Sequence, residues 1–156
     1  MARIIKAPNR IPRKGFSVFL AGSIEMGKAE NWQKYIENGF TNTDIIILNP
    51  RRDDWDSSWS QDISNDKFRE QVEWELRAME RADIIVVYFD PDTRSPITLL
   101  EFGLFAKSGK LIVCCPDGFW RKGNVDIVCK KFRIEKAVNL YNLKLKMIGR
   151  YFDAEG

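Results

Sequence analysis

Glu101 is the residue of this chain whose type and position best fit a chemical role. It lies in an apolar segment over 95–108 that predicts a helix, directly after an apolar run over 82–89 that is typical of a buried parallel strand. The helix is apolar almost all round, so we expect it to be largely buried. A carboxylate there is costly unless it is paired or faces a cavity, and the carboxyl end of such a strand is where open α/β sheets form ligand crevices. Glu101 is therefore a candidate nucleophile; the alternative is a structural ion pair with Arg51, Arg52 or Arg94.

The sequence contains no histidine. Its absence excludes Ser-His-Asp and Cys-His catalysis, histidine-ligated zinc sites and histidine acid–base chemistry. Catalysis must then come from carboxylates, lysine, tyrosine, cysteine or backbone groups. Because the chain has 22 acidic residues, carboxylates are the leading candidates.

Composition indicates an ordinary globular protein. A chain of 156 residues with 44% hydrophobic and 30% charged residues fits one domain with a sizeable core. The net charge is only +3, and the basic stretches over 3–14 and 130–136 fit solvated faces better than a nucleic-acid footprint. We therefore expect no nucleic-acid polymer as a partner.

Cysteine usage and the absence of targeting segments predict a cytoplasmic protein. Cys114 and Cys115 lie in an apolar run and fit reduced core residues, and no CxxC spacing occurs. There is no signal peptide and no 18-residue apolar stretch, so no membrane partner is expected. G-x-G-x-x-G and Walker A motifs are also missing, which argues against a bound dinucleotide or P-loop chemistry. No metal or organic cofactor is implied.

Segments that predict strands alternate with segments that predict helices. Strands are expected over 16–21, 44–48, 83–89, 110–115 and 134–138. Helices are expected over 28–38, 67–81, 95–108, 124–131 and 140–151. This alternation implies a parallel sheet with right-handed crossovers. We predict a single α/β domain over 1–156, a flavodoxin-like or Rossmann-like five-stranded parallel sheet with helices on both faces, preceded by an N-terminal extension over 1–14.

Two segments that follow predicted strands are candidates for substrate binding. The Gly22-Ser23 turn allows close backbone approach of a small ligand, with Ser23 donating a hydrogen bond, although a plain strand end has the same pattern. The segment over 49–66 is long for a loop, and its tryptophans argue against disorder. These tryptophans could instead pack structurally or at a subunit interface. We predict a substrate-side loop, with candidate binding residues Asn49, Arg51, Asp53 and Trp55.

Six segments between residues 16 and 128 carry a resemblance to a known family. They are Leu20-Ala21-Gly22-Ser23-Ile24, Asn49-Pro50-Arg51-Arg52, 82–87, Ser95-Pro96-Ile97, 100–110 and 119–125. In this order they resemble the nucleoside 2-deoxyribosyltransferase superfamily, in particular its nucleoside 2-deoxyribosyltransferase-like branch. The resemblance implies a flavodoxin-like fold and cleavage of an N-glycosidic bond through a covalent deoxyribosyl-enzyme, with Glu101 at the nucleophile position.

The chemistry of Glu101 fits this role. Cleavage passes through an oxocarbenium-like state, and a carboxylate can capture C1′ as in retaining glycosidases. The missing 2′-hydroxyl of a deoxyribose favours such a cation. Attack by a base or nucleoside acceptor then gives exchange, whereas attack by water gives hydrolysis.

A second acid should protonate or hold the departing base. Glu75 matches a family aspartate, with glutamate in its place, although it could also be an ordinary charged residue on an exposed helix face. Asp90 and Asp92, in the loop before the helix of Glu101, are alternatives for base recognition. Aspartate in a turn is also a common local capping residue.

Ser95 leaves open whether the substrate is a nucleoside or a nucleoside 5′-monophosphate. In the resembling family, transferases have an aspartate six residues before the nucleophile that holds the 5′-hydroxyl, whereas the related 5′-monophosphate N-glycosidases have a serine that helps bind phosphate. This chain has Ser95, but Glu25 occupies the place of a phosphate-binding arginine, for which Arg51 and Arg52 could compensate.

Three functions follow, all with a small-molecule nucleoside or nucleotide and a free nucleobase as partners. The first is deoxyribosyl transfer between bases, with Glu101 as nucleophile and Glu75 or Asp92 assisting. The alternative is hydrolysis of 2′-deoxynucleoside 5′-monophosphates. The third is a non-catalytic nucleotide-binding or sensing module. The resemblance also implies a homo-oligomer in which a neighbour helps to complete the site.

Overall fold

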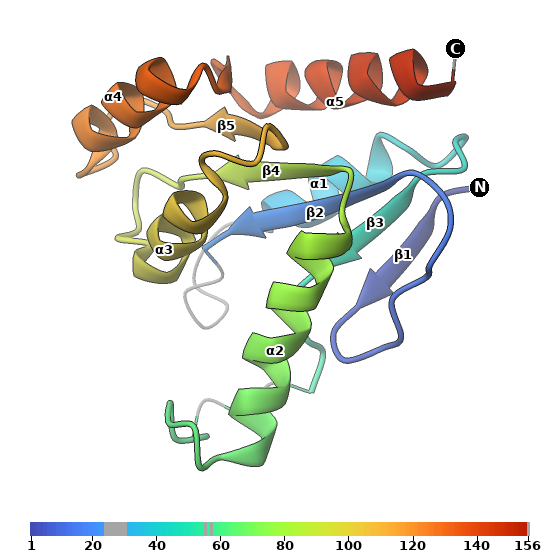
Figure 1. The fold of residues 1–156 in the computed structure, drawn as a ribbon, viewed down its shortest axis with the longest axis vertical. Coiled ribbons are helices and arrows are strands. Elements are labelled where there is room, and N and C mark those ends of the chain that lie inside the picture. Colours follow the sequence, from blue (N-terminus) through green and yellow to red (C-terminus); the bar gives the residue numbers. More distant parts are fainter. Residues whose placement is uncertain (24–30, 55, 57, 156) are drawn as a thin grey trace.

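The computed structural model describes residues 1–23, 31–54, 56 and 58–155, which form a parallel sheet with helices on both faces (Figure 1). The strands are β1 (Arg3–Lys6), β2 (Ser17–Gly22), β3 (Ile46–Asn49), β4 (Ile84–Tyr88), β5 (Leu111–Cys114) and β6 (Glu135–Ala137). The helices are α1 (Trp32–Asn38), α2 (Asp66–Arg81), α3 (Pro96–Phe105), α4 (Lys122–Phe132) and α5 (Leu140–Glu155). The predicted single-domain α/β fold is confirmed. Part of the predicted helix over 28–38 lies outside the described residues.

The strand order is β1-β3-β2-β4-β5-β6. Counted from β2, the last five strands follow the order 2-1-3-4-5 of flavodoxin-like sheets. The sheet has six strands rather than the predicted five, because β1 forms within the segment expected to be an N-terminal extension and pairs with β3 along its whole length. Its sequence Arg3-Ile4-Ile5-Lys6 has charged ends and no long apolar run, which an edge strand tolerates but a central strand does not.

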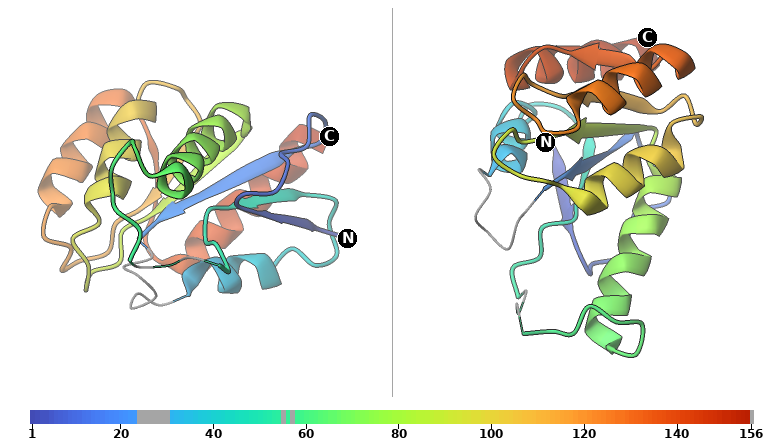
Figure 2. Two further views of the ribbon diagram at one scale, coloured as in Figure 1. Left: turned by 90° about the horizontal axis from the view of Figure 1, so that it is seen from below. Right: turned by 90° about the vertical axis from the view of Figure 1, so that its left-hand side faces the viewer.

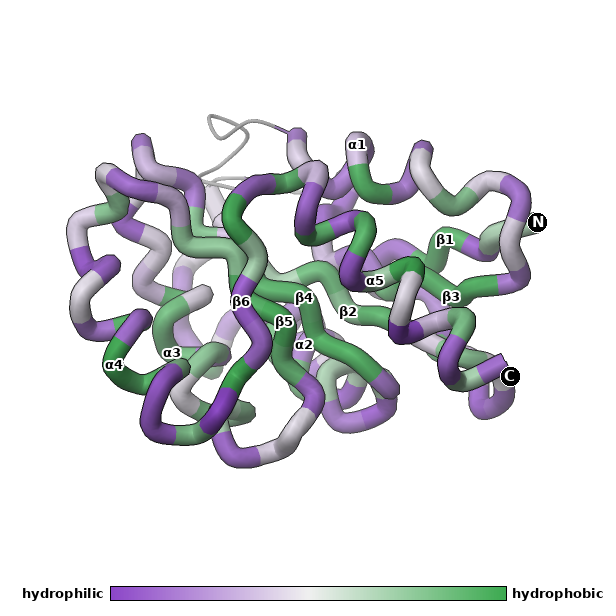
Figure 3. The backbone as a smooth tube through the Cα atoms, turned by 90° about the horizontal axis from the view of Figure 1, so that it is seen from above, coloured by the Kyte–Doolittle hydropathy of each residue, from purple (hydrophilic) through white to green (hydrophobic). Residues whose placement is uncertain are grey.

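Two hydrophobic layers hold the helices to the sheet, since successive strand residues point to opposite faces. α1 and α5 cover one face, where Trp32 and Met147 are fully buried. α2, α3 and α4 cover the other, with Trp74 and Phe102 packed into that layer. Figure 2 shows these two helical layers, and Figure 3 shows the strands as the hydrophobic centre between them.

The expectation that the helix of Glu101 is largely buried is wrong. Only Thr98 and Phe102 of α3 are buried, whereas Ile97, Leu100 and Leu104 are 60%, 59% and 57% exposed. α3 belongs to the outer layer of a three-layer fold, so the sheet covers just one side of it. The apolar residues on its other side therefore face outward.

No helix among the described residues is long and apolar enough to cross a membrane.

A substitution at Gly22 would test how tightly α1 packs against the end of β2. A Cβ added to Gly22 would lie 2.7 Å from Cε2 of the Trp32 indole, a ring fixed in the core. We therefore expect Gly22→Ala to lower the free energy of unfolding by about 1–3 kcal/mol, as overpacking does. Gly149→Ala is the matched control: the exposed helical Gly149 has open space around it, and the substitution should stabilise by about 0.5–1 kcal/mol. Urea unfolding measures both, and equal midpoints for Gly22→Ala and the unmodified protein would contradict this packing.

Candidate active site

The candidate site lies at the carboxyl ends of β2 and β4, where the order of the strands reverses. Gly22 at the end of β2 pairs in register with Tyr88 at the end of β4. The chain continues from β2 to α1 on one face and from β4 to α3 on the other (Figure 2). Neighbouring strands whose connections diverge in this way leave a crevice between them, which is the usual ligand position in open α/β sheets.

Two carboxyl groups, Glu101 of α3 and Glu75 of α2, lie close enough to interact electrostatically. Both side chains are half-buried. Burial raises the pKa of Glu101 well above its usual range, and the nearby charge of Glu75 raises it further. Burial raises the pKa of Glu75 to about 7, against a smaller opposing effect of a hydrogen bond from Gln71. Because the two groups interact, they titrate as a pair that readily holds one proton near neutral pH.

The structural ion pair considered for Glu101 does not form in the described part of the chain, where its carboxylate has no cationic partner. Arg52 instead contacts Asp54 at 2.6 Å and Glu70 at 2.9 Å. The guanidinium of Arg94 stacks over Trp120, 5.1 Å from the ring centroid. Arg51 donates to Gln33 Oε1 at 3.3 Å.

Helix α2 is fixed at two points, and these set the position of Glu75. The Gln71 amide donates to the Pro50 carbonyl oxygen at 2.8 Å and to Glu75 Oε1 at 3.2 Å. Three residues further on, the buried Trp74 indole donates to the Asn9 carbonyl oxygen at 2.7 Å. The carboxyl of Glu75 is thereby tied to the loop that follows β3.

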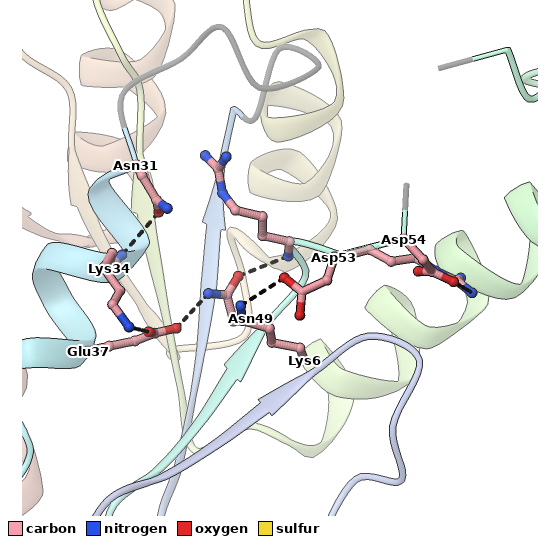
Figure 4. A network of polar contacts seen from close by, with 9 residues as sticks. Lys6, Asn31, Lys34, Glu37, Asn49, Asp53 and Asp54 are labelled. Atoms are coloured by element: carbon pink, nitrogen blue, oxygen red, sulfur yellow. Dashed lines mark hydrogen bonds and ion pairs between the residues drawn. The ribbon is translucent and has the colours of Figure 1, made fainter. Parts of the chain in front are cut away.

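Asn49 and Asp53, two predicted substrate-binding residues, make contacts within the protein (Figure 4). The buried amide of Asn49 donates to Glu37 Oε1 at 2.7 Å and accepts from the Arg51 backbone N–H at 2.9 Å. Asp53 forms an exposed ion pair with Lys6 at 3.1 Å. These contacts join the end of β3 to α1 and to β1, so both residues shape the loop on which Arg51 sits.

The loop between β4 and α3 holds Asp90, Asp92 and Ser95. Buried Asp90 accepts through Oδ1 from the Asp92 backbone N–H at 2.9 Å, which is the local capping role of aspartate in turns. Asp92 itself is exposed. Ser95 is buried, with its hydroxyl 2.6 Å from that of Thr93 and its backbone in the left-handed region at φ 49°. It occupies the N-cap position of α3 without a side-chain capping bond, so the loop places two hydroxyls at the start of the helix that carries Glu101.

Several buried polar atoms have no hydrogen-bond partner among the described residues. They include Trp32 Nε1, Gln33 Nε2, Arg51 Nε and Gln71 Oε1. Each costs folding free energy when it is left unpaired. Sequence reasoning identified only Arg51; Trp32 and Gln33 lie in a helical pattern that looked ordinary, and Gln71 gave no signal. Trp55, predicted to bind substrate, and Glu25, discussed above for phosphate binding, lie outside the described residues.

The cysteines of this chain are buried, and their thiol pKa values are raised. Cys114, Cys115 and Cys129 are free and buried, and burial raises their thiol pKa values to about 12, 11 and 11. A thiol with so high a pKa is a poor nucleophile at neutral pH. Within residues 1–23, 31–54, 56 and 58–155, no three cysteine, aspartate or glutamate side chains gather to hold a metal ion.

The raised pKa values predict how stability changes with pH. A carboxyl whose pKa is higher in the folded than in the unfolded state contributes fully below the unfolded value, near 4.5, and its contribution is lost as pH rises through the folded value, about 7 for Glu75. Glu75→Gln should therefore gain stability relative to the unmodified protein between pH 5 and pH 8, by roughly 3 kcal/mol at most. Urea unfolding at both pH values checks this, with exposed Glu80→Gln as a control that should show no such gain. If Glu75→Gln and the unmodified protein differ in free energy of unfolding by the same amount at pH 5 and pH 8, the carboxyl of Glu75 is not buried as described.

A comparison with protein-family models matched residues 15–119 to the family described as nucleoside 2-deoxyribosyltransferase like. No curated protein matches the sequence. The matched segment covers more than half of the 156 residues and includes β2 to β5, both carboxyl groups and the loops around them. The chain therefore belongs to the nucleoside 2-deoxyribosyltransferase-like family.

Proposed function

We propose that this protein cleaves the N-glycosidic bond of 2′-deoxyribonucleosides and transfers the sugar to another base through a covalent intermediate on Glu101. The observation that carries the proposal is the pairing of Glu101 of α3 with Glu75 of α2: burial opposes ionisation of both, and the charge of Glu75 further opposes that of Glu101. Two carboxyls in unequal environments are the usual way to supply a nucleophile and an acid at one site. The family match supports glycosyl transfer or N-glycoside cleavage as the reaction class.

Before the first step the proton of the pair passes from Glu101, whose ionisation the charge of Glu75 opposes, to Glu75. The Glu101 carboxylate so formed attacks C1′ of the deoxyribose while the bond from C1′ to the base nitrogen breaks. Glu75 gives its proton to the departing base, so the negative charge passes from Glu101 to Glu75. In the second step a nitrogen of the acceptor base attacks C1′, the ester bond to Glu101 breaks, and Glu75 takes up the proton that the acceptor loses. The pair returns to its starting state with one proton.

The buried polar atoms near the crevice would recognise the substrate. The N–H groups of Gln33 and Arg51 suit carbonyl or ring-nitrogen acceptors of a base, and Gln71 Oε1 suits an amino or imino donor. Pairing these atoms with a ligand removes a folding cost, so it favours binding. Asp92, exposed in the loop before α3, would assist in base recognition.

Hydrolysis of 2′-deoxynucleoside 5′-monophosphates is a second candidate because of one observation. The hydroxyls of Thr93 and Ser95 lie at the N-terminus of α3, a ten-residue helix whose dipole favours a bound anion there. A 5′-phosphate in this position would place its sugar toward Glu101. A binding module without turnover has less support, since it gains nothing from the cost of burying Glu75 and Glu101 together.

Glu101→Gln should abolish base exchange, with a fall in rate of at least about a thousandfold, because the amide cannot form the glycosyl ester. The assay separates deoxyadenosine, deoxyadenosine monophosphate and free bases by chromatography, with and without a second base. New nucleoside that appears only with the acceptor base supports transfer. Release of adenine from the monophosphate alone supports the hydrolase instead.

Two controls complete this assay. Glu80→Gln removes a carboxylate from the same helix as Glu75, away from the pair, and should keep full activity. If Ser95 binds the 5′-phosphate, Ser95→Ala should raise KM for the monophosphate and leave KM for the nucleoside unchanged. Full activity of Glu101→Gln would overturn the covalent mechanism.

We also infer that the protein forms a homo-oligomer through the outer side of α3. Ile97, Leu100 and Leu104 recur at helical spacing there and are more than half exposed. Gly103 beside them has open space, which permits close approach of a second helix. An apolar stripe on a single helix can pack against its own copy about a two-fold axis.

Leu104→Lys should convert the oligomer to a monomer, because it places a charge within this stripe. Size-exclusion chromatography with light scattering measures the mass directly. Leu145→Lys, at an exposed leucine of α5, is the matched control and should keep the oligomeric mass. A monomeric unmodified protein, or an unchanged mass for Leu104→Lys, would overturn this interface.

A further inference from the structure

A hollow of about 280 Å³ lies between α2 and the loop that follows β1, the blue segment beside the green helix in Figure 1. Its lining comes from two segments distant in the sequence. The lining residues are Pro8, Asn9, Arg10, Ile11, Arg13, Trp74, Arg77 and Arg81. Four of these eight residues are arginine, and none is acidic.

Among the described residues, no partner accounts for the four arginines. In the described part of the chain none of them forms an ion pair or a side-chain hydrogen bond, whereas Arg52, Arg69 and Arg150 each bind a carboxylate. Arg77 and Arg81 are four residues apart on α2, a spacing at which like charges destabilise a helix. Arg81 also lies in the last turn, where a cation suits the helix dipole, but this does not explain the other three.

Hydrogen bonds within the protein hold the floor of the hollow in place. The Trp74 indole is almost fully buried and donates to the Asn9 carbonyl oxygen at 2.7 Å. The Asn9 backbone N–H in turn donates to the Lys6 carbonyl oxygen at 2.9 Å. The loop is thus fastened to both α2 and β1, so the backbone segments that carry Arg10 and Arg13 and that carry Arg77 and Arg81 are joined at Trp74.

This hollow is separate from the candidate active site. Arg77 follows Glu75 by two positions, which places it about 200° further around the helix. Gln71 and Glu75 face the loop after β3, whereas Trp74 faces the loop after β1. The residues that line the hollow include none of those assigned to the reaction.

We propose that the hollow is a binding site for an oligophosphate, either inorganic or the phosphate chain of a nucleotide. One guanidinium group can bind two phosphate oxygens at once. The four arginine side chains together match the several negative charges of an oligophosphate. The volume lies just below the range of roughly 300–1,000 Å³ that holds whole drug-sized ligands. It has room for a phosphate chain. The charge is confined to one hollow rather than a stripe, which disfavours a nucleic-acid polymer.

Isothermal titration calorimetry on the full chain at low salt tests this site, with inorganic tripolyphosphate as the first probe. We expect saturable one-to-one binding that weakens as salt rises, because the contacts are ionic. Arg77→Gln/Arg81→Gln should weaken it about tenfold or more, through loss of two charge-assisted contacts. Arg10→Gln/Arg13→Gln should act in the same way and covers the case in which the α2 variant fails to fold.

Control variants and further ligands decide the outcome. Arg3→Gln/Lys131→Gln removes the same charge from exposed positions elsewhere and should change the affinity less than twofold. Glu101→Gln should bind as the unmodified protein does, since the sites are separate. If deoxyadenosine triphosphate and tripolyphosphate bind with equal affinity, the site recognises the phosphate chain alone. If deoxyadenosine triphosphate binds more tightly, the ligand of the site is a nucleotide. No binding of either phosphate, an equal loss in the control, or tighter binding of a DNA oligonucleotide would overturn the proposal.

Discussion

The rest of the site depends on one unfavourable interaction, the burial of two carboxyl groups against each other. Glu75 and Glu101 come from separate helices, and desolvation and repulsion both act to push them apart or to neutralise them. If α2 or α3 could move, the two carboxyl groups would separate and the free-energy cost of their burial and repulsion would fall. The fold prevents such movement because α2 is bonded to two loops and α3 is packed on the sheet through Phe102. The cost is therefore retained as a raised pKa, which is the property that acid catalysis needs.

The edge strand β1 contributes to that scaffold, although it lies far from the carboxyl pair in the sequence. The loop that follows it accepts a hydrogen bond from Trp74, and Lys6 at its end pairs with Asp53 in the loop after β3. A residue range that resembles a dispensable extension thus supports the helix of Glu75 from one side and the substrate loop from another. Adding β1 outside β3 leaves the flavodoxin-like order of the other strands intact, so the crevice between β2 and β4 is unchanged.

Sequence patterns were informative where burial dictates residue type. The central strands and the isolated carboxylate of Glu101 are visible because an apolar run permits few exceptions. The same reasoning located α3 but overestimated its burial, since an apolar residue pattern does not say which sides of a helix the sheet covers. β1 was missed because an edge strand pairs through its backbone and needs no apolar run. The unpaired amide of Gln33 also escaped notice, because hydrogen-bond satisfaction depends on neighbours that only the folded chain brings together.

The position of Glu101 on α3 links the two proposals made for this helix. Ile97 and Leu104 lie four residues before and three after Glu101, so they are its neighbours on the exposed side, while Thr98 and Phe102 flank it on the buried side. The carboxyl therefore stands at the border of the exposed apolar stripe. A second chain that covered the stripe would also reduce access of water to a sugar bound at Glu101. Transfer requires that the covalent intermediate survive until a base arrives, whereas hydrolysis requires that water reach it first. Assembly through α3 would then favour transfer, and an isolated chain would lose more of its intermediate to water.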